Sequence, residues 1–436
     1  MGIEPTILYE QDSTLLTTTI EVVLTVGATD DPVGKNGLTQ FMGSLMLRGT
    51  KKEKRSEFQS TVEQMGGSLN VIATEDSLVF LGRVIRENTA PFLNKIRDFI
   101  LTPRFDKKEL SMLKNEILAD IMDAKNSNMA LAGLALRRTL FPHTVLEKPV
   151  AGGLSSVSSI SFSDIESAYN NYVHRGNLLF AVASPLDPSE IKPALSGIWL
   201  KLPDGARHQP RSLEPDVPDS VKVVLVQKPP TSTGVMILAQ KGIKAQDPDR
   251  YALALGDFVF GSEPLISRLF RIIRGELGWT YAIRSSYNTL GPLTYQKGIY
   301  SIAATPSIEF TGKSVFEILK MWREYLKKGV NQSDLQLAQD SAINSYPFDF
   351  ETAELRLGRK LSSLRYQIPL YTQNEYKKKI RGISPSSILK ALHQKHTSHG
   401  WVLILVGDAK QISAQLKAPG EKLAISETFQ PDELIQ

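Results

Sequence analysis

The chain has 436 residues, of which 42% are apolar and 22% charged, and its net charge is +5. These values are typical of a globular protein that is long enough for two domains. The sequence contains no cysteine, which excludes disulfides, thiolate zinc ligands and cysteine nucleophiles. Proteins of the cytoplasm and of the periplasm can both lack cysteine, so the composition leaves both compartments open.

The apolar runs are too short to cross a membrane. The longest, at residues 20–26 and 178–183, have the length of strands, whereas a membrane span needs about 18 to 20 residues. Residues 1–12 contain no charged stretch followed by an apolar core, so no signal peptide is expected. The lysine-rich runs at 51–55 and 377–381 carry no pattern of basic and aromatic residues for stacking on bases, and no nucleic-acid partner is expected.

The first half of the chain alternates strand and helix patterns. Residues 17–26 alternate in the manner of a strand, and a helix is expected over 37–48. A second helix and a strand are expected over 56–81, and 108–121 has the apolar spacing of an amphipathic helix. Residues 162–184 read as a helix cap, an amphipathic helix, a polar turn and a buried strand.

Residues 203–220 are rich in proline and poor in apolar side chains, which is typical of a linker. We therefore expect an N-terminal domain over residues 1–202 and a C-terminal domain over residues 221–436. The second domain is expected to begin with strands at 221–227 and 233–241 and a helix at 249–261.

The two halves resemble each other. Residues 333–346 repeat the helical pattern of 108–121, and residues 385–407 repeat the helix, turn and strand of 162–184 about half a chain later. Duplication of one α+β unit explains both matches. The predicted fold class is α+β, with two homologous domains that each contain a mostly antiparallel sheet backed by helices.

Residues 267–287 contain a candidate pair of functional side chains. An apolar helix is expected to end at Arg274, because Gly275 and Gly278 follow it, and a strand is expected from about Thr280. Arg274 offers five fixed donors, and Tyr281 offers a hydroxyl that can donate to an oxyanion. The alternative is structural: an arginine favoured by the helix dipole and a tyrosine that fills a sheet face.

Four segments in order, at residues 26–52, 65–77, 105–121 and 267–287, resemble the M16 metallopeptidases, the family of pitrilysin and of the mitochondrial processing peptidase. The resemblance covers nearly the whole chain and is strongest to the bacterial M16B type. It implies the two-domain LuxS/MPP-like fold of that family. Catalytic members carry H-x-x-E-H on one helix, where the two histidines bind zinc and the glutamate acts as the general base.

The zinc motif is missing from this chain. The positions that match its two histidines and its glutamate are Gln40, Ser44 and Gly43, and the position of the third zinc ligand, a downstream glutamate, is matched by Asp120. Zinc needs at least three well-placed protein ligands. The degenerate positions Gln40, Gly43, Ser44 and Asp120 cannot supply them, so no metal is expected in this chain.

The resemblance extends to Arg274 and Tyr281, which match an arginine and a tyrosine that hold the substrate near the zinc in this family. It implies that this chain is the non-zinc subunit of a heterodimeric metalloendopeptidase, inactive alone. A homologous M16B subunit with H-x-x-E-H would supply zinc, and the peptide substrate would be bound between the two chains. The alternative is a catalytically inactive structural or peptide-binding protein of the same fold, similar to the core subunits of respiratory complexes.

Three histidines, His393, His396 and His399, follow one another at spacings of three. Such spacing can place two metal ligands together, but no acidic residue or further ligand lies near them in the sequence. We expect a solvated helix end at this position rather than a metal site.

Overall fold

The computed structural model describes residues 4–209, 213–229, 231–287 and 298–436. The chain forms two compact units that combine segments from both sides of the expected linker. Unit 1 contains Met1–Ile121, Lys148–Arg211 and Phe348–Arg365, and unit 2 contains Met122–Glu147, Ser212–Pro347 and Tyr366–Gln436. The chain thus passes from unit 1 to unit 2 within the proline-rich segment, while the predicted domains 1–202 and 221–436 stay a prediction.

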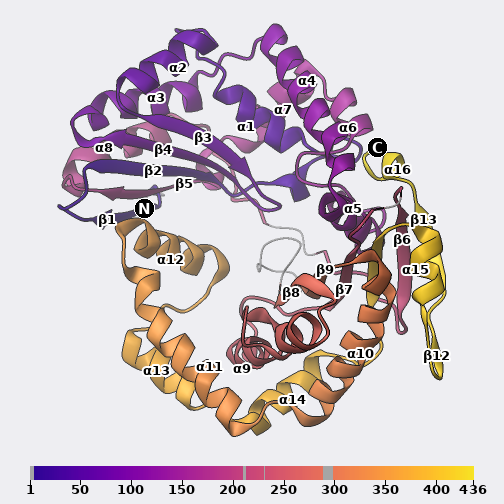
Figure 1. Ribbon diagram of the computed structural model, residues 1–436. Helices are drawn as coiled ribbons and strands as arrows, with labels where there is room; N and C mark the ends of the chain where they lie inside the picture. Colours follow the sequence, from indigo (N-terminus) through magenta and orange to yellow (C-terminus); the bar gives the residue numbers. More distant parts are fainter. Residues whose placement is uncertain (1–3, 210–212, 230, 288–297) are drawn as a thin grey trace. The chain divides into compact units, whose positions relative to one another are not determined.

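Unit 1 is built on a mostly antiparallel sheet (Figure 1). The order of its described strands is β1-β5-β2-β4-β3, and only β1 and β5 pair in parallel. The strands are β1 (Ile7–Gln11), β2 (Thr17–Leu24), β3 (Ser68–Ala73), β4 (Leu78–Ile85) and β5 (Leu178–Ser184). The helices are α1 (Leu38–Met46), α2 (Arg55–Gln64), α3 (Thr89–Leu101), α4 (Lys107–Asp123), α6 (Leu154–Ser159), α7 (Phe162–Tyr172), α8 (Pro188–Leu200) and α12 (Ala353–Tyr366).

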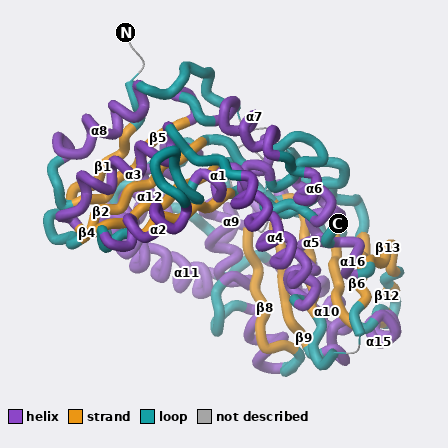
Figure 2. The backbone as a smooth tube through the Cα atoms, turned by 90° about the horizontal axis from the view of Figure 1, so that it is seen from above, coloured by secondary structure: helices purple, strands orange, loops and turns teal. Residues whose placement is uncertain are grey.

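Unit 2 is built on a larger mixed sheet. The order of its described strands is β13-β6-β10-β7-β9-β8, so β8 is an edge strand, and it lies beside β9 in Figure 2. The strands are β6 (Lys222–Gln227), β7 (Val235–Lys241), β8 (Thr280–Tyr287), β9 (Ile299–Pro306), β10 (Val402–Gly407) and β13 (Ile425–Phe429), with a small hairpin of β11 (Lys417–Ala418) and β12 (Glu421–Lys422). The helices are α5 (Asn128–Leu140), α9 (Arg250–Asp257), α10 (Thr311–Lys328), α11 (Gln332–Ser345), α13 (Gln373–Arg381), α14 (Pro385–Lys395), α15 (Ala409–Gln415) and α16 (Pro431–Leu434).

These elements confirm the predicted α+β class. The repeated segments also fold alike, since α7 and β5 of the first half correspond to α14 and β10 of the second half. No helix among the described residues has the length and apolar character needed to span a membrane.

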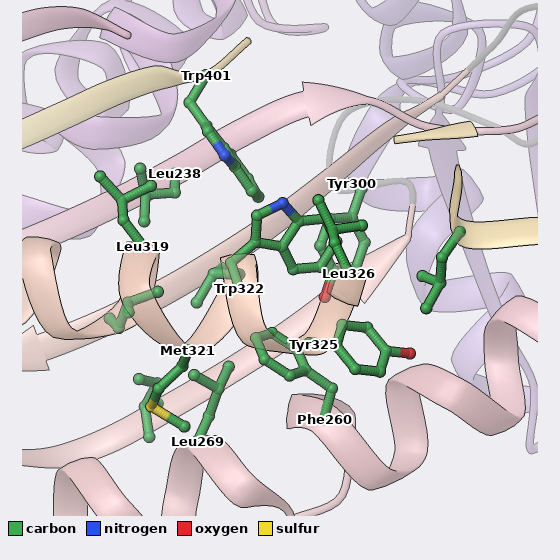
Figure 3. Close-up of a cluster of buried hydrophobic side chains, with 14 of the residues drawn as sticks. Leu238, Phe260, Leu269, Tyr300, Leu319, Met321, Trp322, Tyr325, Leu326 and Trp401 are labelled. Atoms are coloured by element: carbon green, nitrogen blue, oxygen red, sulfur yellow. The ribbon is translucent and has the colours of Figure 1, made fainter. Parts of the chain in front are cut away.

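Strands β2, β5, β6, β7 and β10 are largely buried on both faces, whereas the edge strands β3 and β8 each have an exposed face. In β10, Leu403 and Leu405 pack in one hydrophobic cluster with α9, α10 and α14, whereas Val402, Ile404 and Val406 pack in another with α5. This division follows from the alternation of side chains along a strand. Figure 3 shows part of the first cluster, where the ring of Trp322 lies 5.2 Å from that of Tyr300 and 5.3 Å from that of Trp401.

The two halves exchange one helix each. Helix α5 of the first half covers the sheet of unit 2, and α12 of the second half covers the sheet of unit 1. Leu357 of α12 packs against Ala181 and Ala183 of β5. Ion pairs hold the helix in place: the Arg356 guanidinium lies 3.3 Å from the carboxylate of Glu10 and 3.2 Å from that of Asp12.

The exchanged helix α12 is therefore expected to stabilise unit 1. Leu357→Ala removes a fully buried side chain and should lower the free energy of unfolding by about 2–5 kcal/mol. Leu355→Ala is the matched control on the same helix, because Leu355 is exposed, and it should change that free energy by less than about 0.5 kcal/mol. Urea denaturation followed by circular dichroism measures both. Equal midpoints for the two variants would show that α12 does not stabilise the sheet.

Candidate functional site

Helix α1 carries the positions that match the zinc motif, and its start is fixed by a buried carboxylate. Gly37 has a φ of 99° before the first turn, a conformation that glycine adopts without strain. The Asp31 carboxylate accepts hydrogen bonds from the backbone N–H of Gly37 at 2.7 Å, and from the backbone N–H and the hydroxyl of Thr39 at 2.8 and 2.6 Å. Burial raises the pKa of Asp31 to about 7, although these hydrogen bonds oppose the shift.

The three positions on α1 do not provide the groups of a zinc centre. Gln40 donates a hydrogen bond to the hydroxyl of Ser44 at 3.0 Å. Gly43 is buried against the sheet, where an added Cβ would lie 2.6 Å from a methyl group of Leu78 and 3.0 Å from one of Val71. The place of the general base is thus filled by core side chains.

Helix α4 meets α1 through ion pairs rather than through a metal. Arg48, at the end of α1, contacts the carboxylate of Glu109 at 3.3 Å and also pairs with Glu116. Arg55 lies 3.5 Å from Glu109. Asp120, the position that matches the third ligand, is exposed. The carboxylates that reach α1 are therefore neutralised by arginines.

A cavity of about 470 Å³ opens beside these ion pairs. Its lining includes Ser44 of α1, Arg48 shortly after that helix, Arg55 of α2, Leu113 of α4 and part of the edge strand β3. Within the described ranges, no group of three or more histidine, aspartate or glutamate side chains is placed to hold a metal ion. The residues present do not fit a zinc ion.

Restoring the motif residues should therefore not restore a metal site. In the triple variant Gln40→His, Gly43→Glu, Ser44→His, the glutamate has to displace Leu78 and Val71, which should cost about 1–3 kcal/mol of stability. The double variant Gln40→His, Ser44→His keeps Gly43 and is the control. We expect a lower melting temperature for the triple variant and no stoichiometric zinc by elemental analysis in either. A triple variant of native stability that binds one zinc would contradict this interpretation.

The second candidate region, in unit 2, contains Arg274 and Tyr281. Arg274 lies on a π-helix, η7 (Phe270–Glu276), in which the backbone N–H of Leu277 donates to the carbonyl of Ile272. The helix thus continues past Gly275, contrary to the expected end at Arg274, because the wider π-helical turn accommodates two further residues. Gly278, with a φ of 66°, ends it. The strand β8 then begins at Thr280, as predicted.

The structure brings Arg274 and Tyr281 together. The guanidinium carbon of Arg274 lies 4.5 Å from the ring centre of Tyr281 and 4.7 Å from that of Phe270, so the cation is held between two aromatic rings. The register of β8 shifts between Thr280 and Ile283, and the Tyr281 side chain is 78% exposed. In the part of the chain that the structure describes, Arg274 has no carboxylate partner and the Tyr281 hydroxyl has no hydrogen-bond partner.

Both polar groups are thus open to a ligand. An arginine in this state can donate to a peptide carbonyl or carboxylate, and a phenol can donate to a developing oxyanion. Sequence reasoning found the pair but missed Phe270. The signal was present, because an aromatic residue four positions before an arginine on a helix can lie against it. The roles of Arg274 and Tyr281 stay a prediction.

The expectation for the three histidines was wrong for His396. Its side chain is buried, and Nδ1 donates to the Gln240 side-chain oxygen at 3.1 Å while Nε2 accepts from the Tyr287 hydroxyl at 2.9 Å. The run leaves α14 at this residue and turns into the core, whereas His393 and His399 are exposed. Burial lowers the pKa of His396 to about 3, which keeps the imidazole neutral.

His396 should therefore make stability depend on pH. The unfolded chain binds a proton at this histidine below pH about 6.5, whereas the folded protein does so only near its pKa of about 3. The stability of the wild-type protein relative to His396→Gln should fall by about 1.4 kcal/mol for each pH unit below 6.5. Urea denaturation between pH 7 and 4.5 tests this, with His399→Gln as the control. A stability difference between wild type and His396→Gln that does not change with pH would contradict the buried neutral state.

Comparison with known proteins identifies the class of this fold. The family model described as insulinase, peptidase family M16, matches residues 6–153, and the model described as the peptidase M16 inactive domain matches residues 159–342. A crystal structure of a peptidase M16 inactive domain from Pseudomonas fluorescens superposes with a TM-score of 0.83 at 20% identity, over 92% of this chain and 96% of that chain. The chain belongs to the M16 peptidase family.

Two relatives by sequence place the chain more narrowly. It is 23% identical to a protein of Helicobacter pylori described as the non-peptidase homolog YmxG, over 84% of this chain and 83% of the relative. It is 21% identical to an uncharacterized zinc protease YmxG of Bacillus subtilis, over 81% of this chain and 84% of the relative. The chain is thus similar to bacterial M16B-type members of the family, and its own sequence lacks the H-x-x-E-H motif.

Proposed function

We propose that the chain is the non-zinc subunit of a heterodimeric M16B-type metalloendopeptidase. The observation that carries the proposal is the geometry of Arg274 and Tyr281. The guanidinium is held between two aromatic rings while the hydroxyl remains exposed. Two hydrogen-bond donors that are ordered and exposed in this way are suited to bind a peptide held by a second subunit.

In the proposed reaction the partner subunit supplies H-x-x-E-H, and with it the zinc ion and the glutamate base. This chain contributes binding and charge stabilisation. Arg274 donates to a carbonyl of the bound peptide and fixes its position, because its planar group is already ordered by Phe270 and Tyr281. The Tyr281 hydroxyl donates to the carbonyl oxygen of the scissile bond as that oxygen becomes negatively charged in the tetrahedral intermediate.

Contacts within unit 1 support the proposal that the partner, and not this chain, activates the water. Gly43 is packed against Leu78 and Val71, and the carboxylates of Glu109 and Glu116 are paired with arginines. These contacts support a site that does not itself activate water. They also support the prediction that the chain alone cleaves no peptide.

A second candidate function is a structural or peptide-binding protein of the same fold. The description of the Helicobacter pylori relative as a non-peptidase favours it. In that case Arg274 and Tyr281 take no part in a reaction, and no complex with a zinc-bearing homologue has an activity that depends on them.

The two functions differ in the effect of point variants on turnover. In the complex with a subunit that carries H-x-x-E-H, Tyr281→Phe should lower kcat by one or more orders of magnitude, the usual scale for the loss of an oxyanion donor. Arg274→Ala should lower kcat/KM by a similar factor. Cleavage of a fluorogenic peptide measures both.

Arg323→Ala is the control for these variants, because Arg323 is a partly exposed arginine of α10 that pairs with Glu421. It should retain full turnover. Zinc content and the heterodimer mass are measured for every variant, so that a lost complex is not mistaken for lost chemistry. Unchanged kcat/KM in both Tyr281→Phe and Arg274→Ala would sink the assigned role.

A further inference from the structure

Unit 2 contains a further cavity, with both polar and apolar lining residues, that the proposed reaction does not use. It has a volume of about 570 Å³ and lies between the segment that leads into η7 and the turn from α10 to α11. We name it the Arg271 pocket. Its lining is mixed, and the apolar part includes Phe258, Ile266, Ile272, Val330 and Leu337. A cavity of this size holds one or two side chains.

The charges in the Arg271 pocket are unevenly matched. Arg268 donates to the carbonyl of Gly329 at 3.0 Å and contacts the Asp334 carboxylate at 3.3 Å, so its charge is compensated. Lys328 lies 3.6 Å from Glu324. Arg271 pairs with no carboxylate in the described ranges of the chain. The pocket therefore presents one uncompensated guanidinium beside an apolar wall.

The segment that leads into η7 exposes two large apolar side chains, of which Ile266 lines the pocket. Leu265 is 73% exposed and Ile266 is 50% exposed. Leu265 also has a φ of 78°, a conformation that bulky L-residues rarely adopt. Leu337 of α11 adds a further exposed apolar side chain to the lining. Exposed apolar groups that border a pocket indicate a surface which a ligand covers.

The pocket and the Arg274 pair share one helix. Arg271 and Arg274 both lie on η7, three positions apart, so their backbones lie within one turn of the same helix. A peptide held by Arg274 therefore passes within reach of Arg271. An extended peptide places successive side chains about 3.3 Å apart along its length, so a nearby residue of that peptide can enter the pocket.

We infer that the Arg271 pocket is a specificity subsite that takes an apolar residue and an adjacent carboxylate of the peptide substrate. The apolar side chain lies against Ile266, Ile272 and Leu337, and the carboxylate accepts hydrogen bonds from Arg271. This inference rests on the proposed function, since the peptide is the one that Arg274 holds. It predicts a preference for acidic residues on one side of the scissile bond.

Peptide binding to the purified full-length chain tests the subsite without a partner. The probes are two fluorescein-labelled alanine-based hexapeptides, one with a central Leu-Glu pair and the other with Leu-Gln. Fluorescence anisotropy at physiological salt should show about tenfold tighter binding of the acidic peptide, the scale of one charge-assisted hydrogen bond. Arg271→Gln should bind the two peptides equally. Ile266→Ser should weaken both to a similar extent.

Lys410→Gln, which removes an exposed charge on α15, is the control and should keep the preference of the wild-type chain. Equal binding of both peptides to the wild-type chain, or an unchanged preference in Arg271→Gln, would overturn the inference. So would protection of residues 263–272 from hydrogen exchange by the partner subunit in the absence of peptide, because the pocket would then be a subunit contact. If Tyr281→Phe abolishes turnover in the complex but no acidic preference is found, the proposed function stands and the subsite does not.

Discussion

The fold depends on the burial of two sheets whose central strands are apolar on both faces. Helices α5 and α12 are exchanged between the halves, and each covers the central strands of the sheet formed by the other half. Burial of apolar area is the dominant favourable term in folding. The same demand explains why α1 packs so closely on its sheet that Gly43 contacts Leu78 and Val71. The loss of the zinc site is thus part of the packing of unit 1.

Under the proposed function, the chemistry is divided between two molecules. Unit 1 has a helix at the place of a metal site, but the carboxylates beside it pair with Arg48 and Arg55. Unit 2 keeps two open donors, and the rings of Phe270 and Tyr281 hold the guanidinium of Arg274 between them. Groups that are ordered before a ligand binds lose less entropy when it arrives. Such preordered donors suit a subunit that, under the proposed function, binds the substrate but does not activate the attacking water.

Local sequence patterns predicted most helices and strands, but they could not predict contacts between distant parts of the chain. The repeated helix and strand at 162–184 and 385–407 were predicted because caps, periodicity and buried runs are local. The exchange of α5 and α12 could not be predicted, because an amphipathic helix does not specify which sheet it covers. The burial of His396 was missed because a polar run after a helix reads as a solvated turn. The π-helix at Arg274 was missed because its wider hydrogen-bond register leaves no mark in the spacing of apolar residues.

The central claim is that this chain contributes to a peptidase only as part of a heterodimer. Its most direct test is to co-express the chain with an M16B homologue that carries H-x-x-E-H and is encoded beside it, and then to combine native mass spectrometry, zinc analysis and a peptide-cleavage assay. The account predicts a one-to-one complex with a single zinc ion, and cleavage by the complex but by neither chain alone. A chain that remains separate from the homologue, or a homologue that cleaves peptides equally well without it, would contradict the account.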